Sequence, residues 1–461
     1  MLIEHARVVT WETPNRILED HAVLVEGDLI AAVGPSRELA AQHPAEERIE
    51  AGGKLLLPGL ICAHTHFYGA FARGMAIPGR APEAFPEILA KLWWPLDRSL
   101  TQDDVRLSAL VCLIDAIRHG TTTLVDHHAS PNAIEGSLDV LAEAVEAAGV
   151  RAVLCYEVTD RDGRERREAG IEENLRFLRR CAAGPVGQGR LAATFGLHAS
   201  LTLSDETLVA CRRAAPAGTG FHIHLAEHAV DQYDSLAKSG TRVADRLHRH
   251  GILGDRTIVA HAVHVDAHEI ALLAESRTWV SHQPRSNMNN AVGVAEVESM
   301  LRAGVRVVLG NDGFSNAMWE EWRAAYLVHK VWHRDPRRMP GNEVVRMAAY
   351  HNAELASSFF PGAPLGVISP GARADLILVN YHPITPLTAE NLPWHILFGF
   401  RESQVTSTMA AGRLLMHDAR LLTLDEEVVT AQARQLAAEV WKRYAAQVPP
   451  DSPLQGREPH T

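Results

Sequence analysis

Cysteine is scarce in this sequence and follows no structural pattern. The 461 residues contain five cysteines, an odd number, widely spaced and never in a Cys-x-x-Cys pair. This spacing argues against a disulfide framework and against a cysteine-rich structural zinc site. We therefore expect reduced thiols in a cytoplasmic protein. The cysteines are Cys62, Cys112, Cys155, Cys181 and Cys211.

An excess of basic residues and long apolar runs are also missing. Lys and Arg total 45 against 56 Asp and Glu, a net charge of -11, which argues against nucleic acid as a partner. No apolar run reaches the roughly 20 residues of a membrane-spanning helix. Glu4 and Arg7 interrupt the apolar core that a secretory peptide needs. We expect a small-molecule substrate and no membrane partner, and a homo-oligomer stays open.

The middle of the chain repeats strand-like segments followed by helix-like segments. The chain is 46% hydrophobic and longer than one typical core, which predicts one large domain with a smaller partner or two ordinary domains. Eight apolar or β-branched segments alternate with helically spaced apolar residues, as in repeated βα units. We therefore predict an α/β fold, a (β/α)8 TIM barrel over 57–365. The expected strands are 57–66, 121–128, 150–158, 191–199, 220–227, 257–265, 278–287 and 305–313.

The two flanks of this region have a different texture. Residues 1–56 and 366–423 contain short segments of β-strand type, at 6–10, 20–26, 29–34, 374–380 and 407–415. We predict that the flanks pair into one small β-sandwich domain. The remainder, 424–461, is expected to be a C-terminal helix over about 424–446 with a frayed end over 449–461.

Nearly every predicted barrel strand ends in polar or ionisable residues. In a (β/α)8 barrel the chemistry lies at the carboxyl ends of the strands, while the strand bodies form packed core. The sequence therefore predicts an active site at this end of the barrel. The strand ends carry His64, His66, His127, His128, His198, His224, Glu227, His261, His264, His282 and Asp312.

Four of these residues have the chemistry of a metal site. Along a strand side chains alternate, so His64 and His66 project the same way. His224 and Asp312 end the fifth and eighth strands. A lone histidine is more often a hydrogen-bonded core residue, but three nitrogens and one oxygen on ordered strand ends suit a catalytic metal with room for water. We expect one divalent ion, Zn(II) first, with Fe(II) or Mn(II) as alternatives.

Several motifs together resemble a known family. From Ile3 to Met416 the sequence resembles the amidohydrolase superfamily, in its cytosine-deaminase and chlorohydrolase-like (ATZ/TRZ) branch, and within that branch the SsnA-type aminohydrolases. The motifs of the branch are Pro58-Gly59-Leu60, His64-x-His66, Gly120-Thr121-Thr122-Thr123, His224-x-x-Glu227, His261, Ser286-Asn287-Met288 and Ala374-Asp375-Leu376. The SsnA-type motifs are 127–134 and 287–293.

The resemblance implies a role for each matched residue. His64, His66, His224 and Asp312 would be metal ligands, and a bound metal lowers the pKa of its water towards about 7. This hydroxide would attack a ring carbon of the substrate. Asp312 would also accept the proton of the water, and His261 would orient the nucleophile and stabilise the developing oxygen. Glu227 would shuttle protons to the ring nitrogen and the leaving amine; a capping or packing carboxylate is its alternative.

The fourth strand bears on the number of metals. Some members of the superfamily bind two metals bridged by a carboxylated lysine on this strand, but residues 191–198 contain no lysine. We therefore favour one metal. His222 lies two residues before His224 and one layer deeper, and we expect interior packing rather than a fifth ligand.

The candidate substrate contacts are His198, Arg73, Trp94, His128 and Phe314. In His198, a substrate contact and a polar core role are equally open. Arg73 and Trp94 lie in the long first connection, 67–100, which is typical of a lid; core packing explains at least one tryptophan there equally well. His127 and His128 are interpreted more readily as solvent-exposed loop residues.

Three functions fit these residues. The first is hydrolytic deamination of an amino-substituted nitrogen heterocycle, which Glu227 favours because a leaving ammonia needs repeated proton delivery. The second is hydrolysis of a cyclic amide or another non-peptide C-N bond, with ring opening. The third, a noncatalytic barrel, should have lost a ligand or the shuttle, and this chain has kept all of them.

Overall fold

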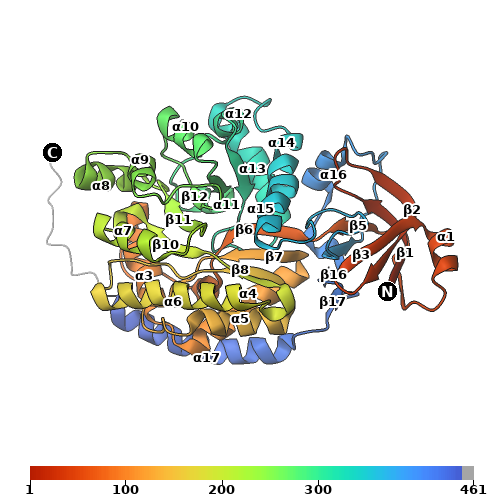
Figure 1. Cartoon of the computed structure of the whole chain (residues 1–461), viewed down its shortest axis with the longest axis horizontal. Helices are drawn as coiled ribbons and strands as arrows, with labels where there is room; N and C mark the ends of the chain where they lie inside the picture. Colours follow the sequence, from red (N-terminus) through yellow and green to blue (C-terminus); the bar gives the residue numbers. More distant parts are fainter. Residues whose placement is uncertain (449–461) are drawn as a thin grey trace.

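The structure of the protein is a computed structural model, which describes residues 1–448. The predicted frayed end, 449–461, lies outside the described residues. Figure 1 shows a central barrel surrounded by helices, with strands from both ends of the chain gathered at one side. Within 1–448, no helix combines the length and apolarity that crossing a bilayer requires.

The barrel is formed by parallel strands in chain order. One sheet has the order β6-β7-β8-β9 and the other β10-β11-β12-β13-β14. The bridges Thr65 to Asp312 and Val158 to Leu197 join the two sheets at both edges. The strands are β6 (Leu60–Thr65), β7 (Thr121–Asp126), β8 (Arg151–Leu154), β9 (Leu191–Ala193), β10 (Phe195–Ala199), β11 (Phe221–Leu225), β12 (Ile258–His261), β13 (Trp279–His282) and β14 (Arg306–Leu309).

Each of the eight predicted segments contains a strand, and the predicted fold class is confirmed. The fourth segment is split at Thr194, so that β9 pairs with β8 and β10 pairs with β11. The seventh strand ends earlier than predicted, because Pro284 starts helix α11 (Pro284–Asn289). That helix carries Ser286 and Asn287 towards the site described below.

Helices cover the outside of the barrel. The first of them, α4 (Gln102–Arg118), begins at a capping box. The Thr101 hydroxyl accepts a hydrogen bond from Asp104 N, and the Asp104 carboxylate accepts one from Thr101 N. The others include α5 (Ser137–Ala148), α6 (Arg164–Ala183), α7 (Asp205–Ala214), α8 (Ala229–Ser239), α9 (Val243–Arg249), α10 (Ala267–Glu275), α12 (Val297–Arg302), α13 (Met318–His333), α14 (Gly341–Val345) and α15 (Asn352–Phe359).

The flanks form a single nine-stranded sheet in the order β18-β17-β16-β15-β5-β1-β2-β3, with β4 beside β1. The sheet folds over an apolar cluster, and Ile30 N of the end strand β3 donates to Ala372 O in the segment that leads into β15. Strand β5 belongs to this sheet although it crosses the predicted border at residue 56. The strands are β1 (Leu2–Val9), β2 (Ile17–Glu26), β3 (Leu29–Pro35), β4 (Arg48–Glu50), β5 (Leu55–Pro58), β15 (Leu376–Val379), β16 (Val405–Ala410), β17 (Arg413–His417) and β18 (Arg420–Leu421).

The long first connection of the barrel is irregular and is held by the last helix. It contains the 3-10 turn η1 (Phe67–Ala72), helix α2 (Phe85–Ile88), the π-helical turn η2 (Leu89–Trp93) and helix α3 (Trp94–Arg98). Helix α17 (Glu426–Gln447) packs on α3 and α4. From α17, Trp441 Nε1 donates to Phe71 O at 2.9 Å and Tyr444 OH donates to Lys91 O at 2.6 Å.

Candidate metal centre

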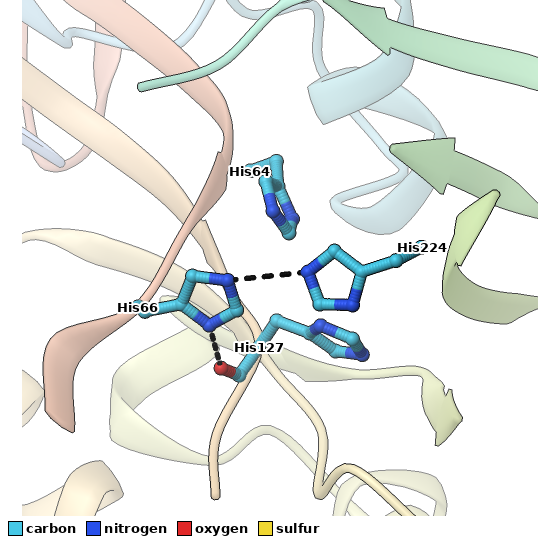
Figure 2. A group of neighbouring side chains, drawn as sticks. All are labelled: His64, His66, His127 and His224. Carbon is cyan, nitrogen blue, oxygen red and sulfur yellow. Dashed lines mark hydrogen bonds between the residues drawn. The ribbon is translucent and has the colours of Figure 1, made fainter. Parts of the chain in front are cut away.

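Four predicted ligands meet at the carboxyl ends of the barrel strands. His66 Nε2 lies 2.9 Å from Asp312 Oδ1, and His64 Nε2 lies 3.3 Å from the same oxygen. His224 Nε2 lies 3.3 Å from His66 Nε2. Figure 2 shows the rings of His64, His66 and His224 gathered around one space, with His127 beside them. The structure thus brings together residues from the first, fifth and eighth strands.

Each of these imidazoles is held at its other ring nitrogen. His66 Nδ1 donates to the His127 carbonyl oxygen at 2.5 Å, and His224 Nδ1 donates to the His198 carbonyl oxygen at 2.8 Å. A carbonyl accepts only, so the proton of each neutral ring is on Nδ1. The Nε2 atoms therefore present lone pairs to the centre.

The tautomer of His64 is set through two further side chains. The Cys155 thiol donates to Asp126 O, and its sulfur lies 3.8 Å from His222 Nδ1, so His222 donates there and keeps a lone pair on Nε2. His64 Nδ1 lies 2.9 Å from that lone pair and donates to it. His64 Nε2 is then also a lone pair. His222 is buried as predicted, but it orients His64 as well as packing against it.

This arrangement fits a divalent cation. The Nε2 atoms of His66 and His224 face each other at 3.3 Å, and when both rings are neutral with their protons on Nδ1, two lone pairs meet there. His64 Nε2 is buried without a hydrogen-bond partner. Converging lone pairs and a carboxylate need a positive charge to offset their repulsion. Three imidazoles and one carboxylate are the donor set of a catalytic Zn(II) or Fe(II) site.

Asp312 and His261 are positioned by helix α11. Ser286 Oγ donates to Asp312 Oδ2 at 2.5 Å, and Asn287 Oδ1 lies 2.8 Å from His261 Nδ1. Both Asp312 and His261 have positive φ angles, 59° and 74°, a strained conformation that is concentrated at functional sites. His261 Nε2 is buried without a partner and lies within 4.8 Å of the ligand atoms of His64, His224 and Asp312.

Glu227 lies beyond the end of β11, where Ala226 turns the backbone with a φ of 48°. Its Oε2 is 3.5 Å from His261 Nε2, and Asn290 Nδ2 donates to its Oε1 at 3.3 Å. Burial raises the pKa of Glu227 to about 7. A carboxyl with this pKa exchanges protons readily at neutral pH.

A cavity extends from the metal site and is lined by aromatic residues of the first connection. His66, His224, Glu227 and Asp312 form one end of its wall. Of the predicted substrate contacts, His198 and Trp94 line this cavity. The lining residues that were not predicted include Tyr68, Phe85, Leu89, Glu157 and Asn290. Glu157 lies near the end of the predicted third strand, 150–158, and follows β8 in the structure, so its position marks it in the same way as the histidines.

The predicted solvent exposure of His127 and His128 is wrong. Both side chains are fully buried, because His127 stacks on the His222 ring and His128 packs between the Tyr68 and Tyr156 rings. His128 Nε2 lies 2.9 Å from Ser130 Oγ, and burial lowers the pKa of His128 to about 3. Within residues 1–448, His128 is not one of the residues that line the cavity. His127 instead supports the metal site through its carbonyl oxygen.

Arg73 and Phe314 lie outside the cavity. They line a neighbouring hollow that shares Trp93, Asn290, Asp312 and Gly313 with it. Arg73 is exposed, and the Arg285 guanidinium lies 5.3 Å from the centre of the Phe314 ring. The Trp93 indole lies between the two spaces.

The fold and the site define an amidohydrolase. Residues 55–415 match the amidohydrolase family, and residues 22–45 match the imidazolonepropionase-like composite domain of bacteria. The chain belongs to the amidohydrolase family, which confirms the resemblance of the sequence. It is a hydrolase that acts on non-peptide C-N bonds.

The most similar relatives include deaminases. The 5-methylthioadenosine/S-adenosylhomocysteine deaminase of Pelotomaculum thermopropionicum is 32% identical over 96% of this chain and 99% of its own. The 5'-deoxyadenosine deaminase of Methanosarcina mazei is 31% identical over 96% and 99%. The structure of a zinc-bound adenosine deaminase from Xanthomonas campestris has a TM-score of 0.83 and 25% identity, over 96% of this chain and 98% of that one.

Proposed function

We propose that this protein is a metal-dependent aminohydrolase that deaminates an amino-substituted nitrogen heterocycle of purine type. The observation that carries the proposal is Glu227, a buried carboxyl 3.5 Å from His261 in a cavity that begins at the metal site. The relatives named as deaminases of adenosine-derived compounds support the same reaction.

The metal ligands in this proposal are His64, His66, His224 and Asp312. We propose Zn(II), because their donor set suits it and the Xanthomonas campestris structure contains zinc. When bound, the ion supplies a water activated for attack at neutral pH. Ser286 holds the second oxygen of Asp312, so one carboxylate oxygen stays directed at the metal site.

Glu227 moves protons, and His261 orients the nucleophile beside it. Glu227 delivers a proton to the ring nitrogen beside the attacked carbon, takes up a proton that the attacking water gives up, and passes it to the leaving amine, which departs as ammonia. His261 is kept in place by Asn287, and its unpartnered Nε2 is directed at the reacting atoms. Asn290 restrains Glu227 on its other oxygen. These contacts hold the acid where charge develops.

Aromatic residues shape the cavity for a planar ring. Tyr68, Phe85, Trp93 and Trp94 all come from the first connection and line the same space. Aromatic side chains stack on flat heterocycles with little loss of conformational entropy. We therefore propose that this segment holds the ring while the strand ends perform the reaction.

The compartment of the enzyme follows from its thiols. All five cysteines are free, and burial raises the pKa of Cys62 to about 12. Free, unreactive thiols are typical of a reducing compartment. We propose that the enzyme acts in the cytoplasm.

The test is a substrate panel on metal-loaded protein. Zn(II)-reconstituted enzyme is incubated with adenine nucleosides, guanine, diaminopurine, aminopterins and cyclic amides, with metal-free protein as the control. We expect release of free ammonia and exchange of an amino group for an oxo group, measured by a coupled assay and mass spectrometry. Uptake of a whole water without ammonia would contradict deamination and assign the protein to ring opening.

A further inference from the structure

Helix α13 carries apolar side chains on its outer face. Its inner face packs on the rest of the protein through Trp319, Trp322 and Ala325, which are buried. The outer face of such a surface helix is usually polar. Here Leu327 and Val331, about one turn apart, expose 54% and 77% of their surface. Covering these side chains with a second apolar surface would lower the free energy.

A second helix widens this apolar surface. Helix α16 (Leu392–Gly399) packs on α13, where the Tyr326 and Phe398 rings meet edge to face with 5.7 Å between their centres. Phe398 exposes 61% of its surface, and Trp394, about one turn away on the same helix, exposes 40%. We call these exposed side chains of the two helices the outer patch. Its members are Leu327, Val331, Trp394 and Phe398.

The outer patch is large enough for a stable interface between proteins. An aromatic side chain has roughly 150–250 Å² of surface, so the two half-exposed aromatic residues present on the order of 200 Å². With the two aliphatic residues the patch reaches on the order of 300–400 Å², a size that is often functional. Two such patches together bury roughly 600–800 Å². Their charged rim brings the total past the roughly 1,000 Å² that a biological interface needs.

The charges at the two ends of the α13 face are opposite. Glu320 lies in the first turn of the helix, and Arg334 caps its end. Each is seven residues from Leu327, about two turns, so the three residues lie on one face. The Glu320 side chain is 46% exposed although it pairs with Arg285, and Arg334 is exposed. Along its outer face the helix is therefore acidic, then apolar, then basic.

This order of charges is complementary to itself. If two copies of α13 pack antiparallel across a two-fold axis at Leu327, Glu320 of each copy faces Arg334 of the other, and the apolar side chains meet between these pairs. Antiparallel packing also brings the opposite ends of the two helix dipoles together. Arg323 flanks the face, and its charge is already paired with Glu402. The surface that fits the outer patch is thus a second outer patch.

We propose that the outer patch is the two-fold interface of a homodimer, in which α13 packs antiparallel against α13 of a second copy of this chain. Trp394 and Phe398 of each copy widen the contact beside the paired helices. The inference concerns assembly and does not depend on the proposed deamination. Its test needs no substrate, so the two proposals fail separately.

The experiment measures the mass of the Zn(II)-loaded full chain in solution by sedimentation velocity at micromolar concentrations. We expect twice the chain mass for the wild type. In Leu327→Glu/Val331→Glu, carboxylates from both copies meet at the axis, so we expect a monomer. The control Val209→Glu puts the same charge on an exposed apolar residue of α7, at the other end of the barrel in Figure 1, and should stay dimeric. A monomeric wild type, or a dimeric Leu327→Glu/Val331→Glu, would overturn the inference.

A charge swap tests the antiparallel arrangement. Arg334→Glu brings two acidic side chains together at each end of the contact, and we expect the dissociation constant of the dimer to rise at least about ten-fold. Glu320→Lys/Arg334→Glu restores opposite charges and should recover most of the affinity. Thermal unfolding checks that each variant is folded. A dimer of Arg334→Glu as tight as the wild type, or a folded double variant without recovery, would overturn the antiparallel interface.

A lipid surface is the other occupant to test. The wild type and Leu327→Glu/Val331→Glu are sedimented with vesicles of phosphatidylcholine and phosphatidylglycerol. We expect neither protein to bind, because the second copy covers the outer patch of the wild type and the carboxylates repel the anionic lipid in the variant. Binding of the wild type that the variant loses would assign the patch to a membrane and overturn the inference.

Discussion

The ends of the barrel strands and the first connection, 67–100, meet at the same cavity but are built differently. At the strand ends, each ligand imidazole is fixed by a hydrogen bond at Nδ1. The connection consists of short 3-10, π and α turns, and hydrogen bonds from helix α17 tie it down. In the proposed reaction, the barrel strands therefore fix the reacting groups, while the first connection shapes the space for the ring of the substrate.

The irregular backbone of the connection has a physical reason. Pro86 and Pro95 lie in the first turns of α2 and α3, where proline is tolerated, and they limit how far either helix extends. The π-helical turn Leu89–Trp93 lies between them, and such turns are frequent at functional sites. The result is a chain path that turns Leu89, Trp93 and Trp94 towards the cavity.

Removing a metal ligand should have the largest effect. In His224→Ala the site loses one of three imidazoles, so we expect loss of bound metal and of activity, measured by mass spectrometry and ammonia release. His268→Ala, an exposed histidine on α10 paired with Asp245, is the control and should keep both. A fully active His224→Ala would show that the barrel end does not hold the metal.

Removing the proposed shuttle should come next. Glu227→Gln keeps the shape of the side chain but cannot exchange a proton, so kcat should fall by about 10²- to 10⁴-fold. The metal content should stay at the wild-type level, because Glu227 is not a proposed ligand. Unchanged kcat would contradict the role of Glu227, and loss of metal would make it a ligand.

A smaller effect is expected from His222, which holds a proposed metal ligand in place. His222→Phe removes the partner of His64 Nδ1, and we expect metal affinity to fall by about 10- to 100-fold, measured by competition with a chelator. With saturating metal, much of the activity should return. Phenylalanine preserves most of the buried ring volume, and thermal unfolding of the metal-free protein checks the fold. An affinity equal to wild type would mean that His222 only packs.

The smallest effect should come from the tethers of the connection. Trp441→Phe and Tyr444→Phe each remove one hydrogen bond to the backbone of the first connection. Each bond contributes about 1 kcal/mol of stability. We expect the double variant to raise KM a few-fold with unchanged kcat and metal content. A drop in kcat without a change in KM would contradict the assignment of the reaction to the strand ends and of ring binding to the first connection.

The sequence alone predicted the barrel strands and the four residues that converge at the proposed metal site, because both depend on local pattern. Apolar and helical periodicities mark βα units, and strand ends mark the catalytic edge of a barrel. The same reasoning failed for His127 and His128, which are buried. Their exposure depends on which segments pack over them, and a strand end carries no information about that.

What the sequence determined by itself is therefore the fold class, the family and the residue types of the metal site. Tertiary structure decided which nitrogen of each imidazole faces the proposed metal site, that Glu157 Oε1 is buried without a hydrogen-bond partner, and that Arg73 and Phe314 line a neighbouring hollow. His64 and His222 are 158 positions apart. Contacts of this kind arise only when the barrel closes, because no local pattern encodes the partner of a side chain across it.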